Sequence, residues 1–357
     1  MSVADCIGNF FLESWIYGKY EREIHSSILA QIDQQFPTQK NLLLNLTFWD
    51  EKTDKEVKQY IDSGANLDNL FVLSTVDSPT CAMPNQLLYN DPNIKLNMII
   101  NSFNAKNVYR MGNFSGQYEF NFFAIVCNDN FKSYDLDELL LVDPKYLFIN
   151  YNRKPHPHRV EFVKQLLIHN LKDLGIVTLG RDQNSLLYFS IGESAENYVK
   201  YGHWYNLDQG PGSDQFGIPH DLFSLHNMYY WKHHFLHVVG STEGNQINEP
   251  FVNQIEFKPI IGLRPFVING QQKIYQWLRD NGFKTFNHYF PTVDLEGGTT
   301  AGEIYNAIIQ VLTQLSTLSK EELVALYNQM LPDLLYNRQR FFEFAKEQEY
   351  KMKHLFQ

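Results

Sequence analysis

Residues 251–287 have the sequence FVNQIEFKPIIGLRPFVINGQQKIYQWLRDNGFKTFN, which carries the strongest pattern in the chain. Residues 251–261 have the apolar spacing of an amphipathic helix, and Gly262 supplies the glycine that commonly ends one. A short apolar strand, PFVI, follows and is closed by the Asn-Gly turn at 269–270. The second helix is amphipathic, with an apolar face formed by Ile274, Trp277 and Leu278. Helix, strand and helix in this order predict an α/β layer fold.

Further strands and helices alternate along the rest of the chain. Apolar runs bounded by turn residues predict strands at 41–49, 69–76, 95–100, 120–126, 146–150, 176–179 and 235–240. Helical patterns lie between several of them, and three more predicted helices, at 300–316, 319–330 and 332–355, end the chain. Strands that alternate with helices indicate a mostly parallel sheet.

The length of 357 residues suits two domains, and 44% hydrophobic residues are enough for two cores. The segment DLDELLLVD at 135–143 has the character of a connection, and an Asp-Pro turn follows it. We therefore expect an N-terminal α/β domain at 1–143 and a C-terminal α/β domain at 144–316. Helices at 317–357 would pack on these domains.

Charge and cysteine content limit the classes of partner and compartment. The formal net charge of −10 argues against a broad nucleic-acid surface and leaves room only for a local basic groove. The cysteines Cys6, Cys81 and Cys127 lie far apart, which is typical of a reducing compartment. No signal-peptide pattern and no apolar run of about 20 residues occurs. We expect a cytoplasmic protein without a membrane span, for which nucleic acid is an unlikely partner.

The first candidate site is the basic loop NRKPHPHR at 152–159, between a predicted strand and a predicted helix. Helix N-termini attract anions, and Pro157 suits the first turn. Arg153, Lys154 and Arg159 add positive charge, and arginine can bind phosphate through two hydrogen bonds. The alternative is a basic surface loop that only caps the helix.

Two further candidates follow later strands. Thr242-Glu243-Gly244-Asn245 comes directly after the strand at 235–240, and its carboxylate and amide suit sugar or ribose hydroxyls. The helix at 251–261 adds Asn253, Gln254 and Lys258 near its start. A plain turn and an ordinary surface helix are the alternatives. His233 and His237 have the i, i+4 spacing of zinc ligands, but their aromatic surroundings favour packing, so we expect no metal site.

Several of these motifs, taken in order, resemble a family of viral and bacterial proteins classed with glycosyltransferases. Its members carry a strand followed by a loop like NRRPRPHR and a leucine-rich helix, which here is YLFINYNRKPHPHRVEFVKQLL. They also carry a TE-type motif after a strand, here Thr242-Glu243. A block like FITEKTFKPIxxGxPFIxxG and a GFKTF segment complete the pattern, and 251–286 matches both. The resemblance covers most of the second half of the chain.

The resemblance implies a GT-B-like fold, with two Rossmann-like domains facing a cleft, similar to fucosyltransferases and exostosin-like enzymes. It implies that Arg159 holds the diphosphate of a nucleotide-sugar donor, with Arg153 and His158 assisting. Glu243 and Asn245 would face the sugar or the nucleotide. No metal and no cofactor other than the donor substrate is implied, and a viral member would act in the host cytoplasm.

One part of the block differs from the family pattern. The family has Thr-Glu-Lys where this chain has Asn253-Gln254-Ile255, so a neutral amide replaces the carboxylate that commonly holds the ribose. Three explanations stay open: Lys258 or Arg264 replaces the missing positive charge, the donor differs, or activity has declined.

The leading functional hypothesis is a glycosyltransferase that moves a sugar from a nucleoside-diphosphate sugar to a hydroxyl acceptor such as a glycan. Such a reaction commonly needs a general base, and Asp77 and Glu119 are the candidates. One alternative is a non-catalytic nucleotide- or sugar-binding protein on the same scaffold. The other is a DNA-modifying glycosyltransferase, against which the acidic charge counts.

Overall fold

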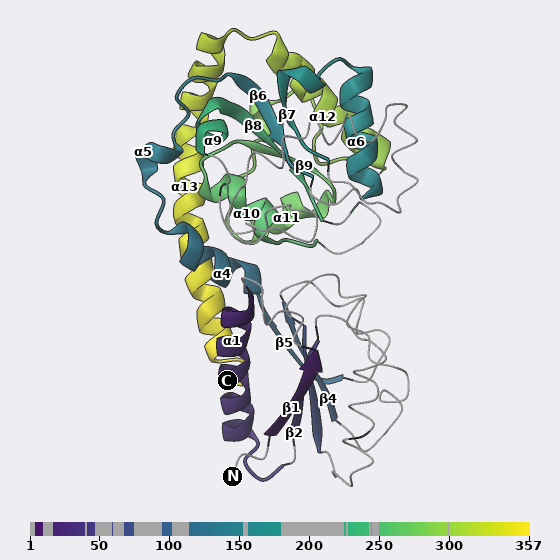
Figure 1. Cartoon of the computed structure of the whole chain (residues 1–357), viewed down its shortest axis with the longest axis vertical. Helices are drawn as coiled ribbons and strands as arrows, with labels where there is room; N and C mark the ends of the chain where they lie inside the picture. Colours follow the sequence, from purple (N-terminus) through teal and green to yellow (C-terminus); the bar gives the residue numbers. More distant parts are fainter. Residues whose placement is uncertain are drawn as a thin grey trace. The chain divides into compact units, whose positions relative to one another are not determined.

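The structure is a computed structural model. It describes residues 4–9, 17–39, 41–46, 59, 68–74, 95–101, 114–152, 156–179, 225, 228–242, 244, 250–298 and 300–357. The chain forms two compact units, each with its own sheet (Figure 1). The first unit contains residues Met1–Val126 and Ala345–Gln357, and the second contains Cys127–Phe344.

The first unit contains a five-stranded parallel sheet. Its strands are β1 (Ala4–Asn9), β2 (Asn41–Leu46), β3 (Asn69–Ser74), β4 (Lys95–Asn101) and β5 (Phe114–Phe120). They lie side by side in the order of the sequence, so the described strands contain no reversal of order. Helix α1 (Tyr17–Gln35) joins β1 to β2 and buries Ile24, Ile28 and Ile32, whose spacing of four places them on one helical face.

The last residues of the chain belong to this first unit. The Gln31 side-chain amide donates to the Met352 carbonyl oxygen at 3.0 Å, and Asn121 N–H donates to Gln348 Oε1 at 3.0 Å. The Phe356 ring lies 5.7 Å from the Phe71 ring, edge to face. The C-terminus therefore helps to build the core of the first unit.

The second unit contains a four-stranded parallel sheet with the order β7-β6-β8-β9. Its strands are β6 (Tyr146–Asn150), β7 (Gly175–Val177), β8 (His234–Gly240) and β9 (Phe266–Asn269). The chain passes from β6 to β7 on one side and then to β8 on the other side of β6. The order therefore reverses between β6 and β8, which makes the carboxyl ends of these two strands a topological switch point.

Helices cover the second sheet. Helices α6 (Pro157–Ile168) and α12 (Ala301–Ser316) pack against each other and against β9, while α10 (Gln254–Ile261) packs against β8 (Figure 1). The remaining elements are α4 (Phe122–Phe131), α5 (Leu136–Leu139), η4 (Lys172–Leu174), α9 (Met228–His233), α11 (Lys273–Asp280), η6 (Asn287–Tyr289) and α13 (Lys320–Lys353). The α/β class predicted from the sequence is thus confirmed.

Three of the sequence expectations differ from the structure. Residues 120–126 were expected to form a strand, but α4 begins at Phe122. An apolar run that is buried all round does not distinguish strand from helix, and Asn121 Oδ1 caps the helix by accepting from Ala124 N–H at 2.8 Å. The helices expected at 319–330 and 332–355 are one helix, α13, with Pro332 inside it. Buried side chains on both sides of the proline hold the helix together, including Met330, Leu334 and Phe341.

The domain boundary also lies elsewhere than the expected position at residue 143. The second unit begins at Cys127, because the segment 135–143 packs within it rather than linking two domains. Leu139 is buried there, and its carbonyl oxygen accepts from Arg264 Nη1 at 2.7 Å. Most of α13 likewise belongs to the second unit, where Phe341 lies 5.0 Å from the ring of Phe257.

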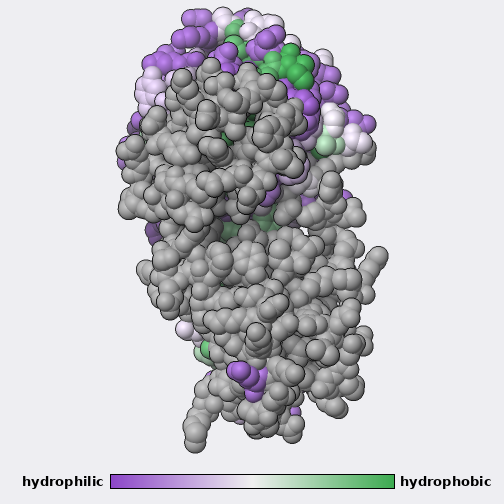
Figure 2. All heavy atoms as spheres, turned by 45° about the vertical axis from the view of Figure 1, so that its right-hand side comes forward, coloured by the Kyte–Doolittle hydropathy of each residue, from purple (hydrophilic) through white to green (hydrophobic). Residues whose placement is uncertain are grey.

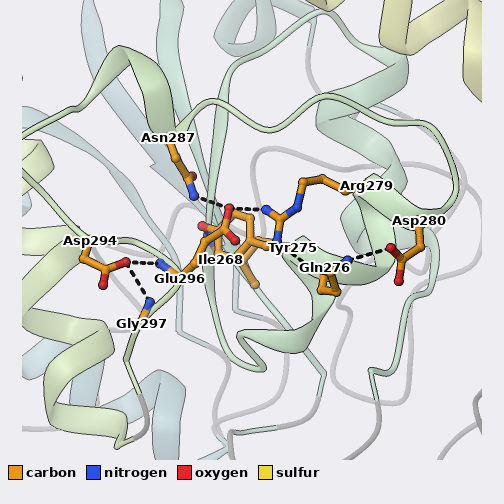
Figure 3. A network of polar contacts seen from close by, with 9 residues as sticks. All are labelled: Ile268, Tyr275, Gln276, Arg279, Asp280, Asn287, Asp294, Glu296 and Gly297. Carbon is orange, nitrogen blue, oxygen red and sulfur yellow. Dashed lines mark hydrogen bonds and ion pairs between the residues drawn. The ribbon is translucent and has the colours of Figure 1, made fainter.

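A polar network fixes the end of α11 to the loop before α12 (Figure 3). Glu296 accepts from both Arg279 and Asn287. Asp294 Oδ1 accepts from the backbone N–H groups of Glu296 and Gly297 at 3.1 and 2.8 Å. These contacts hold a loop whose conformation the apolar pattern alone does not specify.

On the face shown in Figure 2 the described atoms are mostly hydrophilic, with a compact group of hydrophobic atoms in the second unit. Helices of an α/β layer turn polar faces outward in this way. Among the described residues, no helix combines the length and the apolar character that crossing a membrane requires.

Candidate functional site

The candidate site lies at the switch point of the second sheet, where three segments meet. They are the first turn of α6, the residues that follow β8, and the first turn of α10. In open α/β sheets ligands bind outside the carboxyl ends of the strands at such a point. The side chains of the three segments are joined by hydrogen bonds, which are described in turn below.

Two asparagines fix the carboxyl end of β6. Asn150 Nδ2 donates to the Val238 carbonyl oxygen on β8 at 2.9 Å. Asn152 Nδ2 donates to Asn150 Oδ1 at 2.5 Å and to the Thr178 carbonyl oxygen at 3.0 Å. Both asparagines are buried, and their amides tie the end of β6 to β8 and to the residue after β7.

Gly240, the last residue of β8, makes room for this arrangement. A Cβ atom at this position would lie 2.4 Å from Asn152 Oδ1, which is much closer than real contacts allow. The glycine is therefore required by the close approach of the asparagine. The sequence did not predict that residue 240 must be glycine, and it did not predict the contacts of the two asparagines. These contacts join segments that are far apart in the chain.

Arg159 holds the end of β8 from the first turn of α6. Its Nε donates to the Ser241 carbonyl oxygen at 3.1 Å, and its Nη2 donates to the carbonyl oxygens of Gly240 and Ser241, both at 2.9 Å. The side chain is only 3% exposed. Arg159 thus positions the strand end, and the diphosphate contact expected from the sequence stays a prediction.

His158 contacts the same carbonyl group from the same helical turn. Its Nε2 lies 2.9 Å from the Ser241 carbonyl oxygen, and its ring stacks on that of His156 at 5.9 Å. Burial, assisted by the positive charge of Arg159, lowers the pKa of His158 to about 4. The imidazole is therefore neutral at physiological pH.

A buried carboxyl group joins α10 to β8. Glu256 Oε1 accepts from the Ser241 hydroxyl at 2.9 Å, and Glu256 Oε2 accepts from Asn253 N–H at 2.9 Å. Burial raises the pKa of Glu256 to about 7, although these hydrogen bonds and the charge of Arg159 oppose that shift. The sequence signals this arrangement, because Asn253 and Glu256 have the spacing of a capping box.

The residues at the start of α10 that were expected to bind the nucleotide-sugar donor have different environments. Asn253 is the N-cap residue: its Oδ1 accepts from Ile255 N–H at 2.8 Å and its Nδ2 donates to Thr242 Oγ1 at 2.8 Å. Gln254 is buried, and its Oε1 has no hydrogen-bond partner among the described residues. Lys258 is also buried, and its charge lowers the pKa of the Cys127 thiol, which burial raises more strongly.

Four predicted site residues, Asp77, Arg153, Glu243 and Asn245, lie outside the described part of the chain. Glu119 is described, and it is exposed on β5 in the first unit. The structure brings together His158, Arg159 and Asn253 through the end of β8. It adds Ser241 and Glu256, which the sequence reasoning did not select as site residues.

Arg264 does not supply the positive charge that the altered motif lacks. Its guanidinium group is fully buried and donates to the carbonyl oxygens of Trp231 and Leu139. The expectation that Arg264 replaces the missing charge is therefore wrong, while the same role for Lys258 stays a prediction. Arg264 joins α5, α9 and α13 instead, since it also donates to the Tyr327 hydroxyl at 3.3 Å.

The two histidines with zinc-like spacing do not form a ligand pair. His233 stacks on Tyr229 and bonds through Nδ1 to its carbonyl group at 2.7 Å, while His237 packs in the core beside Trp231. Within the described ranges, no group of three His, Cys, Asp or Glu side chains could hold a metal ion.

Comparisons with known proteins give little further information. No protein-family model matches this chain. No curated protein matches it either. A solved structure, the N-terminal domain of trehalose-6-phosphate phosphatase from Candida albicans, is similar with a TM-score of 0.41 and 9% identity, over 95% of this chain and 77% of that one. A similarity at this level supports no argument about fold or activity.

Proposed function

We propose that the protein is a glycosyltransferase that moves a sugar from a nucleoside-diphosphate sugar to a hydroxyl acceptor, such as a glycan. The observation that supports this most is the convergence of α6, β8 and α10 at the switch point of a parallel sheet, together with the sequence resemblance. Nucleotides bind at this place in α/β sheets. Two Rossmann-like domains of the GT-B type are part of the same proposal.

Within this proposal, the donor phosphates bind at the N-terminus of α6 and not at that of α10. The α10 N-terminus is closed by its capping box, since Asn253 and Glu256 occupy its first backbone groups. The α6 N-terminus has no side-chain cap, and Pro157 occupies its first position. Helix N-termini without a cap favour anions, and the adjacent Arg153 adds charge.

The reaction requires stabilisation of the diphosphate as it leaves the sugar. The dipole of α6 and the basic loop would supply this without a metal ion. A general base would deprotonate the acceptor, and Asp77 and Glu119 are the candidates. Glu243 and Asn245 would face the sugar.

Two observations favour a second candidate, a binding protein without turnover. The donor hydrogens of Arg159 that contact β8 are used on carbonyl oxygens, and Ile255 stands where the resembled family has a lysine. Both features weaken the stabilisation of a charged leaving group while leaving a place for a nucleotide.

A donor panel separates the two candidates. The full chain is screened with nucleotide sugars by thermal shift, and donors that stabilise it are then assayed for release of nucleoside diphosphate with mixed glycan acceptors. A transferase gives stabilisation and acceptor-dependent release, whereas a binding protein gives stabilisation alone. If no nucleotide sugar stabilises the protein, both candidates are excluded.

A further inference from the structure

The two ring nitrogens of His158 have different environments, which fixes the position of its proton. Nε2 lies 2.9 Å from the Ser241 carbonyl oxygen. A carbonyl oxygen can only accept a hydrogen bond, so Nε2 must carry the hydrogen atom. The same carbonyl oxygen also accepts from Arg159 Nε at 3.1 Å, so the contact is part of a fixed arrangement at the end of β8.

The second nitrogen, Nδ1, then has no proton at physiological pH. Burial and the neighbouring Arg159 guanidinium lower the pKa of His158 to about 4, so the ring carries a single proton. Because that proton is on Nε2, Nδ1 presents a lone pair. The carboxyl group of Glu256 does not reverse this, since it bonds to the serine hydroxyl.

Gly244, which has no side chain, lies next to Nδ1 of His158. A Cβ atom at Gly244 would lie 3.2 Å from His158 Nδ1, so a side chain there would cover the nitrogen. Gly244 follows β8 and lies among the residues expected to face the donor. His158 itself is half-buried.

We propose that His158 is a specificity-determining residue whose Nδ1 accepts a hydrogen bond from an O–H or N–H group of the nucleotide sugar. This inference rests on the proposed function. A lone pair repels a phosphate oxygen, which has no hydrogen to donate when ionised, so His158 binds the neutral part of the ligand. This role replaces the one expected from the sequence, in which His158 assists Arg159 in binding the diphosphate.

Two substitutions separate the acceptor from the contact with Ser241. H158N can present its amide oxygen at the position of Nδ1, but it is too short to reach the Ser241 carbonyl. H158Q can donate to that carbonyl through its amide nitrogen, but it has no acceptor at the position of Nδ1. A purely structural role predicts that H158Q is the better replacement, whereas our proposal predicts that H158N is.

The binding test uses calorimetry on the full chain, with a nucleotide sugar that binds and with analogues that each lack one donor group. The analogues are deoxy forms of the ribose, deoxy forms of the sugar, and N-methylated bases, which distinguish the three sources of the hydrogen. In the wild type and H158N, one analogue should bind about 5- to 10-fold more weakly than the parent compound. In H158Q the same analogue should bind as well as the parent compound.

If each analogue loses the same affinity, relative to the parent compound, in the wild type, H158N and H158Q, the role of His158 is overturned. The proposed function stays intact in that case. Failure of every nucleotide sugar to bind the wild type would overturn both. A separate ¹⁵N NMR measurement of the histidine side chains tests the proton position without a ligand. A neutral ring protonated on Nε2 is expected at pH 7, and protonation on Nδ1 would overturn the proposal.

Discussion

Ser241, directly after β8, is contacted by three side chains from two helices. Its carbonyl oxygen accepts from His158 and Arg159 of α6, and its hydroxyl donates to Glu256 of α10. The three contacting residues are a neutral imidazole, a cation and a carboxyl group with a raised pKa. Exchange of any one of them therefore alters the charge balance of the other two as well as the position of the strand end.

Glu256 should make the stability of the protein depend on pH. Its pKa rises from 4.5 to about 7 on folding, so the folded state holds its proton more tightly than the unfolded state. This contribution to stability is complete below pH 4.5 and is lost as pH rises through about 7. Relative to E256Q, the wild type should lose about 3 kcal/mol of unfolding free energy over this window.

The measurement is urea denaturation of both proteins at a series of pH values, because other titrating groups cancel in the difference. E256Q loses one acceptor of the capping box, so it should be less stable than the wild type at low pH. Parallel stability curves from pH 4 to 8 would show that Glu256 does not titrate in this range.

Gly240 should not tolerate a side chain. Alanine would place Cβ 2.4 Å from Asn152 Oδ1, and that amide is fixed by two hydrogen bonds. We expect G240A to lower the unfolding free energy by about 1 to 3 kcal/mol through overpacking. The matched control is G302A on α12, where no atom lies within 4 Å. The control should gain about 0.5 to 1 kcal/mol, since alanine suits a helix better than glycine. Equal effects at both positions would contradict this account of β8.

At the scale of elements, the capping boxes of α10 and α12 differ in their surroundings. That of α12, formed by Thr300 and Glu303, is exposed. That of α10 is buried and is bonded to Ser241 and Thr242 after β8. The same sequence pattern thus caps the start of a helix at an exposed position in one case. In the other case it also bonds to the residues of the candidate site.

Removal of the two N-cap side chains should therefore have unequal effects. T300A should cost about 1 kcal/mol, the usual value for a lost N-cap. N253A should cost about 1 kcal/mol more, because the bond from Asn253 Nδ2 to Thr242 Oγ1 is lost as well. Thermal or chemical denaturation measures both. Equal costs would mean that Asn253 acts as a simple cap without a part in the site.

The sequence predicted the elements better than their contacts. Strands β2, β3 and β4 were expected because their apolar runs are bounded by turn residues. Helices α10 and α11 followed from helical periodicity, and β9 from the short apolar run between them. Strand β1 and helix α4 were not predicted. The apolar part of α4, residues 122–127, is buried on all sides, and such a run has no period to detect. The contacts of Ser241 with His158 and Arg159 join residues more than 80 positions apart. Local pattern contains no information on such pairs.

At the scale of the whole molecule, the chain leaves the first unit at Val126 and returns to it at Ala345. The return is secured by Phe356, whose ring lies 4.6 Å from Tyr118, 5.7 Å from Phe71 and 6.1 Å from Phe36. The first unit is therefore complete only when the last residues have been added to it.

F356A should loosen the first unit selectively. The loss of three aromatic contacts should lower its local stability by about 1 to 3 kcal/mol, with little effect on the second unit. Hydrogen exchange followed by mass spectrometry on the full chain can measure the two units separately. H354A is the control, because the His354 ring stacks on Tyr350, four positions earlier in the chain, at 4.1 Å. Loss of protection in the second unit alone would contradict this assignment of the C-terminus.

The central claim is that the switch point of the second sheet binds the diphosphate of a nucleotide sugar. Calorimetric titration of the full chain with UDP, GDP and inorganic pyrophosphate tests it most directly. We predict saturable binding of at least one nucleoside diphosphate, clearly tighter than that of pyrophosphate, and weaker at higher salt because phosphate contacts are screened. The absence of binding by any nucleoside diphosphate or nucleotide sugar at millimolar concentration, or equal binding of pyrophosphate, would contradict the claim.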